Sequence, residues 1–304
     1  MSDSPGRKAP NFPLRLNQMT PALKTLVQAP GSPSASAASV PVPAVPTARA
    51  VVSARQAPAR PVLRPQGHMQ LAAAHAAQHV APSGMGMDSA DVRRGLAQRL
   101  HQGGLRDEAV LNAIATVPRH LFVDAALVIQ AYEDTSLPIG HGQTISKPSV
   151  VGRMIELLMA GAQARTQGHL GRVLEVGTGC GYQAAVLAAL AKQVVSIERL
   201  RPLHDKAREL LAPLRIAHLR LIHGDGMLGH PAGAPFDSII AAAGGEALPD
   251  AWLAQLAPGG RLVAPVVDAH GRQALVVVDH TERGLQQTVH EAVHFVPLKS
   301  GLVR

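Results

Sequence analysis

A glycine-rich loop directly after a short apolar run is the first place where this chain could bind a ligand. The run E-V-G-T-G-C-G over 175–181 contains Gly177, Gly179 and Gly181. Glycine lets the backbone turn tightly and approach a ligand closely. Because open α/β sheets bind ligands at the carboxyl ends of their strands, a strand that ends here would place this loop at such a site.

The spacing within the loop distinguishes two kinds of nucleotide ligand. A dinucleotide-binding loop has its third glycine at the position that Tyr182 occupies here. This chain instead has G-x-G-x-G, preceded by the acidic residue Glu175 two positions before the first glycine. The pattern favours S-adenosylmethionine over NAD.

Two further acids follow the next two expected strands. Glu198 lies 21 residues after Gly177, where a carboxylate can accept hydrogen bonds from both ribose hydroxyls. Asp225, within G-D-G, is expected to accept a hydrogen bond from the adenine amino group. Cys180 is interpreted as a small residue near the ligand rather than a nucleophile, because no basic partner is evident. We therefore expect the cofactor to contact Glu175, Gly177, Gly179, Gly181, Glu198 and Asp225.

The elements that must position these residues form a regular alternation of short β-branched runs and helical stretches. This rhythm predicts an α/β fold with a doubly wound, mostly parallel, Rossmann-like sheet. Two final runs are joined by T-E-R-G and predict an antiparallel strand pair at the C-terminal end. The expected strands are 172–176, 193–197, 218–222, 236–241, 261–267, 274–279 and 289–296, and the expected helices between them are 182–191, 202–211 and 248–257.

Helical patterns are also expected before the glycine-rich loop. Order should begin near Asp88, with a helix over about 90–102 and a second short helix that has Asp107 in its first turn. Residues 119–147 contain Pro138, Gly140 and Gly142, which break regular structure, and are expected to be irregular. A further helix is predicted over about 149–160.

The positive charge of the chain is concentrated at one end. Of 304 residues, the first 87 contain eight Lys or Arg, one acidic residue and 13 of the 24 prolines. They carry +7 of the formal net charge of +8. We predict a disordered, basic, Pro/Ala-rich tail over 1–87 and one folded domain over 88–304. A solvated extension is the favoured interpretation of the tail, and a nucleic-acid or membrane-surface arm and a transit peptide are the alternatives.

Several other classes of protein are excluded or disfavoured. The single cysteine excludes a disulfide framework, and no apolar run reaches the ~18 residues of a membrane span. The run H-E-A-V-H over 290–294 matches a zinc-protease pattern, which requires a helix. Here the surrounding residues alternate as in a strand, which would separate His290 and His294 by about 13 Å. No metal site is expected.

Seven short motifs together resemble protein-L-isoaspartate O-methyltransferases, over about 88–304 and in the order of that family. Among these motifs, G-Q-T-I-S best distinguishes this family from other S-adenosylmethionine enzymes, because most of those enzymes share only the glycine-rich loop. One departure is Gly244-Gly245, where proline is expected in many relatives. The motifs are V-P-R-H-L-F-V (117–123), A-Y-E-D (131–134), P-I-G-H-G-Q-T-I-S (138–146), E-V-G-T-G-C-G-Y-Q (175–183), S-I-E-R (196–199), H-G-D-G (223–226) and F-V-P-L (295–298).

The resemblance implies a repair reaction on damaged proteins. A methyl group passes from S-adenosylmethionine to the α-carboxylate of an L-isoaspartyl residue, and the ester then collapses to a succinimide. Ser146 is expected to hold that carboxylate through its hydroxyl, and Gln143 and Thr144 are expected to shape the pocket. The resemblance implies a cytoplasmic monomer whose partners are isoaspartyl proteins and peptides, with neither nucleic acid nor membrane expected as a partner of the folded domain.

Two other functions stay open at this point. The first is a methyltransferase that uses S-adenosylmethionine on a small molecule or a nucleic acid. The second is a non-catalytic protein that keeps the ligand pocket and recruits partners through its basic tail.

Overall fold

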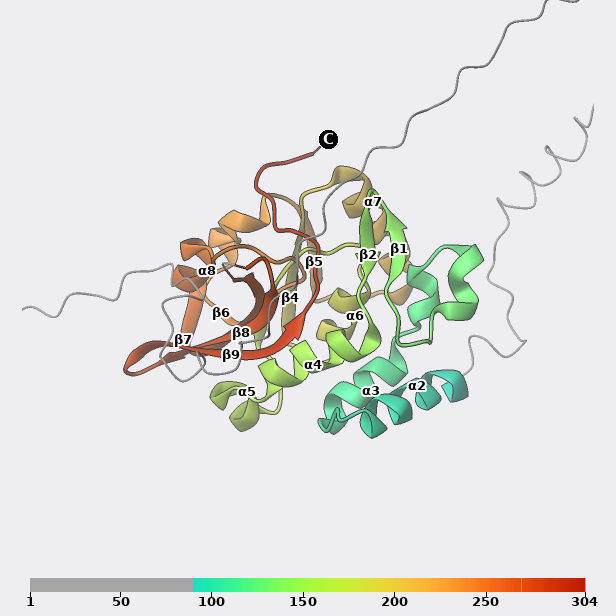
Figure 1. Cartoon of the computed structure of the whole chain (residues 1–304), viewed down its shortest axis with the longest axis horizontal. Helices are drawn as coiled ribbons and strands as arrows, with labels where there is room; N and C mark the ends of the chain where they lie inside the picture. The colour runs from blue at the N-terminus through green and yellow to red at the C-terminus, as the bar shows by residue number, and fades with distance from the viewer. Residues whose placement is uncertain (1–89, 269, 304) are drawn as a thin grey trace, which may run out of the picture. The chain divides into compact units, whose positions relative to one another are not determined.

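A seven-stranded sheet forms the centre of the computed structural model, which describes residues 90–268 and 270–303 (Figure 1). Its strands run in the order β5-β4-β3-β6-β7-β8-β9. The first five are parallel, and β8 and β9 are antiparallel to their neighbours, as predicted. The strands are β3 (Arg172–Val176), β4 (Gln193–Glu198), β5 (Leu219–His223), β6 (Phe236–Ala241), β7 (Leu256–Val267), β8 (Gln273–Thr281) and β9 (Gly284–Val293).

Both faces of the sheet are buried, because neighbouring residues of each central strand belong to different hydrophobic clusters. In β3, Val173 packs into one cluster and Leu174 into the other, and Ile240 and Ile239 of β6 divide in the same way. This period of two follows from the pleat of a strand. It explains why the strands read as continuous apolar runs, as expected of a sheet covered on both sides.

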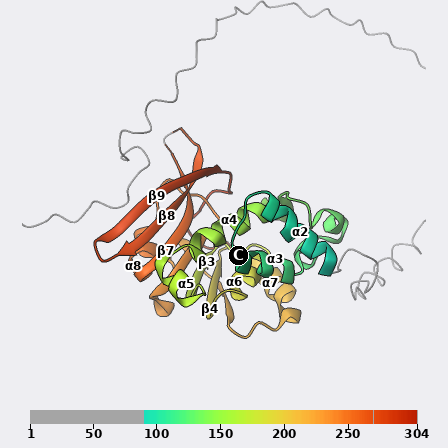
Figure 2. The same cartoon turned by 90° about the horizontal axis from the view of Figure 1, so that it is seen from below.

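Helices from both halves of the described chain cover these two faces (Figures 1 and 2). The first cluster includes buried side chains of α2, α3, α4, α6 and α7, and the second is closed by Trp252 and Leu253 of α8. No helix of the described residues is long and apolar enough to cross a bilayer. The helices are α2 (Ala90–Gln102), α3 (Glu108–Thr116), α4 (Pro148–Met159), α5 (Ala162–Gln167), α6 (Tyr182–Ala188), α7 (Arg201–Leu211) and α8 (Asp250–Gln255).

The segment 119–147 is more regular than the sequence predicts. It contains two 3₁₀ helices, η3 (Arg119–Phe122) and η4 (Ala125–Gln130), and a small antiparallel sheet of β1 (Leu137–Gly140) and β2 (Gln143–Ile145). The prediction was wrong here because the glycines that suggested irregular chain form a tight turn between two short strands. Gly140 and Gly142 both have positive φ in this turn.

Element boundaries differ from the predicted ones mainly near the end of the chain. The last helix ends at Gln255, and β7 begins at Leu256, five residues before the expected strand. The final strand, β9, covers Gly284–Val293 rather than 289–296, because the two-residue turn after Thr281 pairs the strands from their first residues. His290 and Glu291 lie on this strand, so H-E-A-V-H lacks the helix that the zinc-protease pattern requires. The predicted tail over 1–87 lies outside the described residues.

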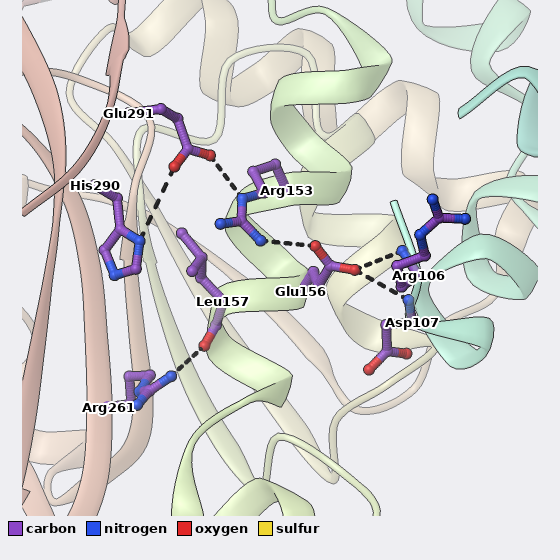
Figure 3. Close-up of polar contacts among 8 residues, drawn as sticks. All are labelled: Arg106, Asp107, Arg153, Glu156, Leu157, Arg261, His290 and Glu291. Atoms are coloured by element: carbon purple, nitrogen blue, oxygen red, sulfur yellow. Dashed lines mark hydrogen bonds and ion pairs between the residues drawn. The ribbon is translucent and has the colours of Figure 1, made fainter. Parts of the chain in front are cut away.

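A polar network holds α4 between the N-terminal helices and the sheet (Figure 3). Glu156 accepts hydrogen bonds from the backbone N–H groups of Arg106 and Asp107, at 2.7 and 3.0 Å, and from Arg153 at 2.8 Å. Arg153 in turn donates to Glu291 of β9 at 2.6 Å. Burial alone would raise the pKa of Glu156, but these hydrogen bonds outweigh it and hold that pKa below its usual value. The network therefore fixes the helix that begins two residues after Ser146.

We expect Glu156→Gln to lower the free energy of unfolding at pH 7 by about 1–3 kcal/mol, because an amide cannot accept from all three donors. The matched control is Glu291→Gln, at a carboxylate that is 43% exposed, and should cost less than about 1 kcal/mol. Chemical denaturation measures both. The loss in free energy of unfolding caused by Glu156→Gln should become smaller as the pH falls below about 4.5. The wild-type carboxylate, whose pKa is lowered in the folded protein, becomes protonated there and no longer stabilises the fold. Equal costs for the two variants would contradict this assignment.

Candidate functional site

A cavity of about 400 Å³ lies at the carboxyl ends of β3, β4 and β6. Its wall combines the glycine-rich loop with segments that are distant in sequence. Among the described residues that line it, the predicted site residues are Gln143, Thr144, Ser146, Gly177, Gly179 and Glu198. The fold therefore brings the expected acceptor loop and the expected cofactor loop to one cavity.

The glycine-rich loop reverses the chain between β3 and α6. Gly177, Gly179 and Gly181 have φ of 93°, 57° and 94°, in the region that favours glycine. A side chain at Gly181 would also meet Leu211 at 2.7 Å. The loop is tied to the neighbouring strand, because the N–H of Gly177 donates to the carbonyl of Ile197 at 2.9 Å. The backbone of the loop is thereby held against the cavity.

Glu198 lines the cavity from the end of β4 and is almost fully buried. One carboxylate oxygen accepts from the N–H of Gly179 at 2.9 Å, and the other accepts from the N–H of Leu200 at 2.9 Å. A carboxylate has about four acceptor positions. Glu198 can therefore bind further hydroxyl donors while it stays fixed in place by the backbone.

Asp225 lies beside the cavity, and its neighbour Gly226 is one of the lining residues. The Asp225 carboxylate accepts from the N–H of Met227 at 2.9 Å and from the N–H of Gly301 at 2.6 Å. It joins the loop after β5 to the C-terminal segment. Its predicted bond to an adenine amino group stays a prediction.

Glu175 is fully buried beneath the glycine-rich loop and is not among the residues that line the cavity. Ser196 of β4 donates to one of its carboxyl oxygens, and Ser196 also shares a 2.6 Å hydrogen bond with Thr178. The side chain of Gln183 also interacts with this carboxyl group and favours its charged form, but burial outweighs both contacts. Burial raises the pKa of Glu175 to about 8, so this acid is mostly neutral near pH 7.

The loop with Ser146 separates the first cavity from a second one of about 360 Å³. Thr144 and Ser146 line both cavities. The second cavity is also lined by Lys147, by the end of β9 and by the residues that follow it, including His294. Thr144 and Ser146 therefore lie where the two cavities meet.

A C-terminal segment, residues 294–303, crosses the carboxyl edge of the sheet and closes part of the first cavity. Gly244 donates its N–H to the carbonyl of Val296 at 2.9 Å and accepts from the N–H of Leu298 at 2.8 Å. A side chain at Gly244 would meet Gln273 at 2.6 Å, and Gln273 donates to the carbonyl of Phe295 at 3.0 Å. The departure at Gly244-Gly245 is thus the place where this segment pairs with the loop after β6.

Cys180 lines the cavity and is buried. Burial raises the pKa of its thiol to about 11, the opposite of what a nucleophilic cysteine needs. Sequence reasoning missed two groups near it. Gln183 lines the cavity and its side chain interacts with Glu175, and Arg119 is buried behind Ser146. The motif V-P-R-H contains Arg119, but its type alone gave no sign of burial.

Comparisons with known proteins identify the family. The model of the family Protein-L-isoaspartate(D-aspartate) O-methyltransferase matches residues 92–302. A protein-L-isoaspartate O-methyltransferase of Methylibium petroleiphilum is 54% identical over 297 residues, which cover 97% of each chain. The family model thus begins after the predicted tail, whereas the alignment with this relative extends into it.

One solved structure supports the same assignment, and a second shows the same fold. A protein-L-isoaspartate O-methyltransferase aligns with a TM-score of 0.62 and 26% identity, over 69% of this chain and 67% of its own. A second, from Plasmodium falciparum and solved with S-adenosyl-L-homocysteine, aligns with a TM-score of 0.59 and 24% identity over 68% of this chain and 98% of its own. This chain belongs to the protein-L-isoaspartate O-methyltransferase family.

Proposed function

We propose that this enzyme transfers a methyl group from S-adenosylmethionine to the α-carboxylate of L-isoaspartyl residues in damaged proteins. The observation that carries the proposal is that the family's G-Q-T-I-S loop, residues 142–146, separates two cavities. The first contains the glycine-rich loop and Glu198, and the second contains the end of β9. A methyl donor and a polypeptide acceptor could thus approach Ser146 from opposite sides.

The residues of the first cavity fit S-adenosylmethionine. Its volume of about 400 Å³ is in the range of small-molecule sites. Glu198 keeps free acceptor positions for ribose hydroxyls, and Gln183 lines the same cavity. The solved Plasmodium falciparum relative holds S-adenosyl-L-homocysteine. When bound, S-adenosylmethionine supplies a methyl group on a positively charged sulfur.

Ser146 is proposed to hold the acceptor carboxylate. Within the described residues its carbonyl accepts from Arg119, whereas no side-chain hydrogen bond occupies its hydroxyl. Thr144 lies on the same wall and Gln143 lines the first cavity. These polar groups can orient one carboxylate oxygen toward the first cavity.

The chemistry requires mainly positioning. A carboxylate is already ionised at neutral pH, so no general base is needed. In the transfer, a carboxylate oxygen forms a bond to the methyl carbon, the carbon–sulfur bond breaks, and its electron pair stays on sulfur. Holding two reactants in line can supply much of the barrier reduction. The protein contributes a fixed serine hydroxyl, a fixed glycine loop and a C-terminal segment that covers the cavity.

Family membership favours this function over a small-molecule or nucleic-acid methyltransferase and over a non-catalytic adaptor. The cytoplasmic location, the monomeric state and the absence of a metal or a nucleic-acid partner stay predictions. The same holds for the predicted domain boundary at residue 88.

We expect the purified protein with labelled S-adenosylmethionine to methylate a peptide that contains one L-isoaspartyl residue and to leave the identical aspartyl peptide unlabelled. The two peptides differ only in which carboxyl group is free. Incorporation of label after acid quench measures the reaction. Label in neither peptide, or equal label in both, would reject the proposed substrate.

Ser146→Ala and Glu198→Ala should separate acceptor binding from cofactor binding. Loss of one hydrogen bond to a charged group costs about 1.5–3 kcal/mol, or roughly 10–100-fold. Ser146→Ala should lower kcat/KM for the isoaspartyl peptide by that factor and keep the Kd of S-adenosylhomocysteine within twofold. Glu198→Ala should weaken that Kd by a similar factor, measured by calorimetry. Wild-type rates in Ser146→Ala would remove this serine from the mechanism.

The raised pKa of Glu175 predicts a pH-dependent effect on stability. Between its ordinary pKa of 4.5 and the folded value of about 8, the folded protein holds a proton that the unfolded chain releases. The contribution of Glu175 to stability is therefore present at low pH and lost as the pH rises through this window. Glu175→Gln should gain stability relative to wild type from pH 5 to pH 8, measured by denaturation.

The control is Glu291→Gln. Burial would raise the pKa of Glu291, but its bond to Arg153 outweighs burial and lowers that pKa. The difference in free energy of unfolding between Glu291→Gln and wild type should therefore stay constant from pH 5 to pH 8. A constant difference for Glu175→Gln would show that Glu175 is charged in the folded protein.

A further inference from the structure

Arg119, the first residue of η3, is fully buried although it carries a positive charge. Among the described residues no carboxylate lies within ion-pair distance of it. Arginine stays protonated in proteins, so burial does not neutralise the group. A buried charge without a partner is costly for a fold. Hydrophobic packing therefore does not account for an arginine at this buried position.

The contacts of Arg119 lead to the acceptor loop. Its Nη2 donates to the backbone carbonyl of Ser146 at 2.8 Å and to that of Thr135 at 3.4 Å. The guanidinium lies 4.7 Å from the centre of the Tyr182 ring. Its Nε and Nη1 have no acceptor. The direct contacts of the group are thus with neutral partners, and Asp134 supplies a more distant negative charge. The guanidinium lies behind Ser146, which lines both cavities.

Other cationic side chains near the site are more exposed than Arg119. Arg199 and Lys299 line the first cavity and Lys147 lines the second, but all three are at least partly exposed. Water and salt screen the charge of exposed groups. Arg119 is the fully buried arginine of the described residues, so its field at the loop is little screened.

We propose that Arg119 is a positioning residue that fixes Ser146 through its carbonyl and places a permanent positive charge behind the acceptor carboxylate. The inference rests on the proposed function, since an isoaspartyl substrate presents an ionised α-carboxylate at this loop. The bound carboxylate would place a negative charge near a guanidinium that makes no direct ion pair within the described residues.

The two contributions of Arg119 should appear in different kinetic constants. Methyl transfer removes the negative charge of the carboxylate, so a fixed cation stabilises the bound acceptor more than the transition state. Loss of the charge should therefore raise KM for the peptide. Loss of the hydrogen bond to Ser146 should lower kcat, because the serine is then less well placed.

The experiment compares Arg119→Gln with Arg119→Lys. The first variant removes the positive charge, and the second keeps the charge but loses the planar guanidinium group with its several N–H donors. We expect Arg119→Gln to raise KM for the isoaspartyl peptide roughly tenfold or more. Arg119→Lys should keep KM within about threefold and lower kcat. Both should bind S-adenosylhomocysteine with a Kd within twofold of wild type. Arg99→Gln is the matched control, because Arg99 also donates to a backbone carbonyl, that of Tyr132, at 2.8 Å.

Each outcome decides the proposal. A KM for folded Arg119→Gln within twofold of wild type would overturn it, as would a Kd for S-adenosylhomocysteine that worsens as much as KM. If Arg119→Gln does not fold, Arg119→Lys decides: a near-wild-type KM with lowered kcat supports the proposal, and parallel losses in KM and Kd overturn it. A wild-type enzyme without activity on the peptide would instead reject the proposed function, and this inference with it.

Discussion

The parallel pairing of β3 with β4 and β6 is the constraint on which the rest of the site depends. Their hydrogen-bond ladders set Val176 beside Ile197 and beside Ala241. Because parallel strands run in one direction, their carboxyl ends meet at a single edge. The glycine-rich loop after β3 and Glu198 at the end of β4 are therefore neighbours across this edge. The register of the sheet, rather than any single contact, assembles the cofactor side of the cavity.

Two segments from outside the parallel strands complete the cavity. The β1–β2 hairpin supplies the acceptor loop, and residues 294–303 cross the same edge and pair with Gly244 (Figure 1). The segment is held mainly by backbone hydrogen bonds and by two side chains, Gln273 and Asp225. The cavity wall is consequently built from several separate stretches of the chain.

Buried ionisable groups surround this cavity on its protein side. Glu175 lies under the glycine-rich loop and Arg119 lies behind Ser146, and no ion pair joins the two. Burial acts on each in the same sense, since it disfavours the charged form. Glu175 is mostly protonated and neutral near pH 7, whereas the guanidinium of Arg119 stays charged. Of these two groups, only Arg119 therefore carries charge, and it lies behind the serine that is proposed to hold the anionic acceptor.

The periodicity and turn residues of the sequence determined most of the fold. β3, β4 and β6 lie within a residue of their predicted ranges, and the antiparallel end pair follows the T-E-R-G turn. These predictions succeeded because strand and helix periods are local properties of the chain. The sequence missed the β1–β2 hairpin and the early start of β9, where pairing with a distant or neighbouring strand decides whether a short run is extended.

For the site, residue type and spacing selected the glycine-rich loop and Glu198, and the resemblance to the family selected the G-Q-T-I-S loop. Only the tertiary structure decided that Glu175 lies beneath the cavity rather than in it, that Asp225 ties down the C-terminal segment, and that Arg119 supports Ser146. The physical reason is that burial and hydrogen-bond partners depend on segments packed from elsewhere in the chain. A sequence shows which groups can do chemistry, and the packing of distant segments sets their charge state and their direction.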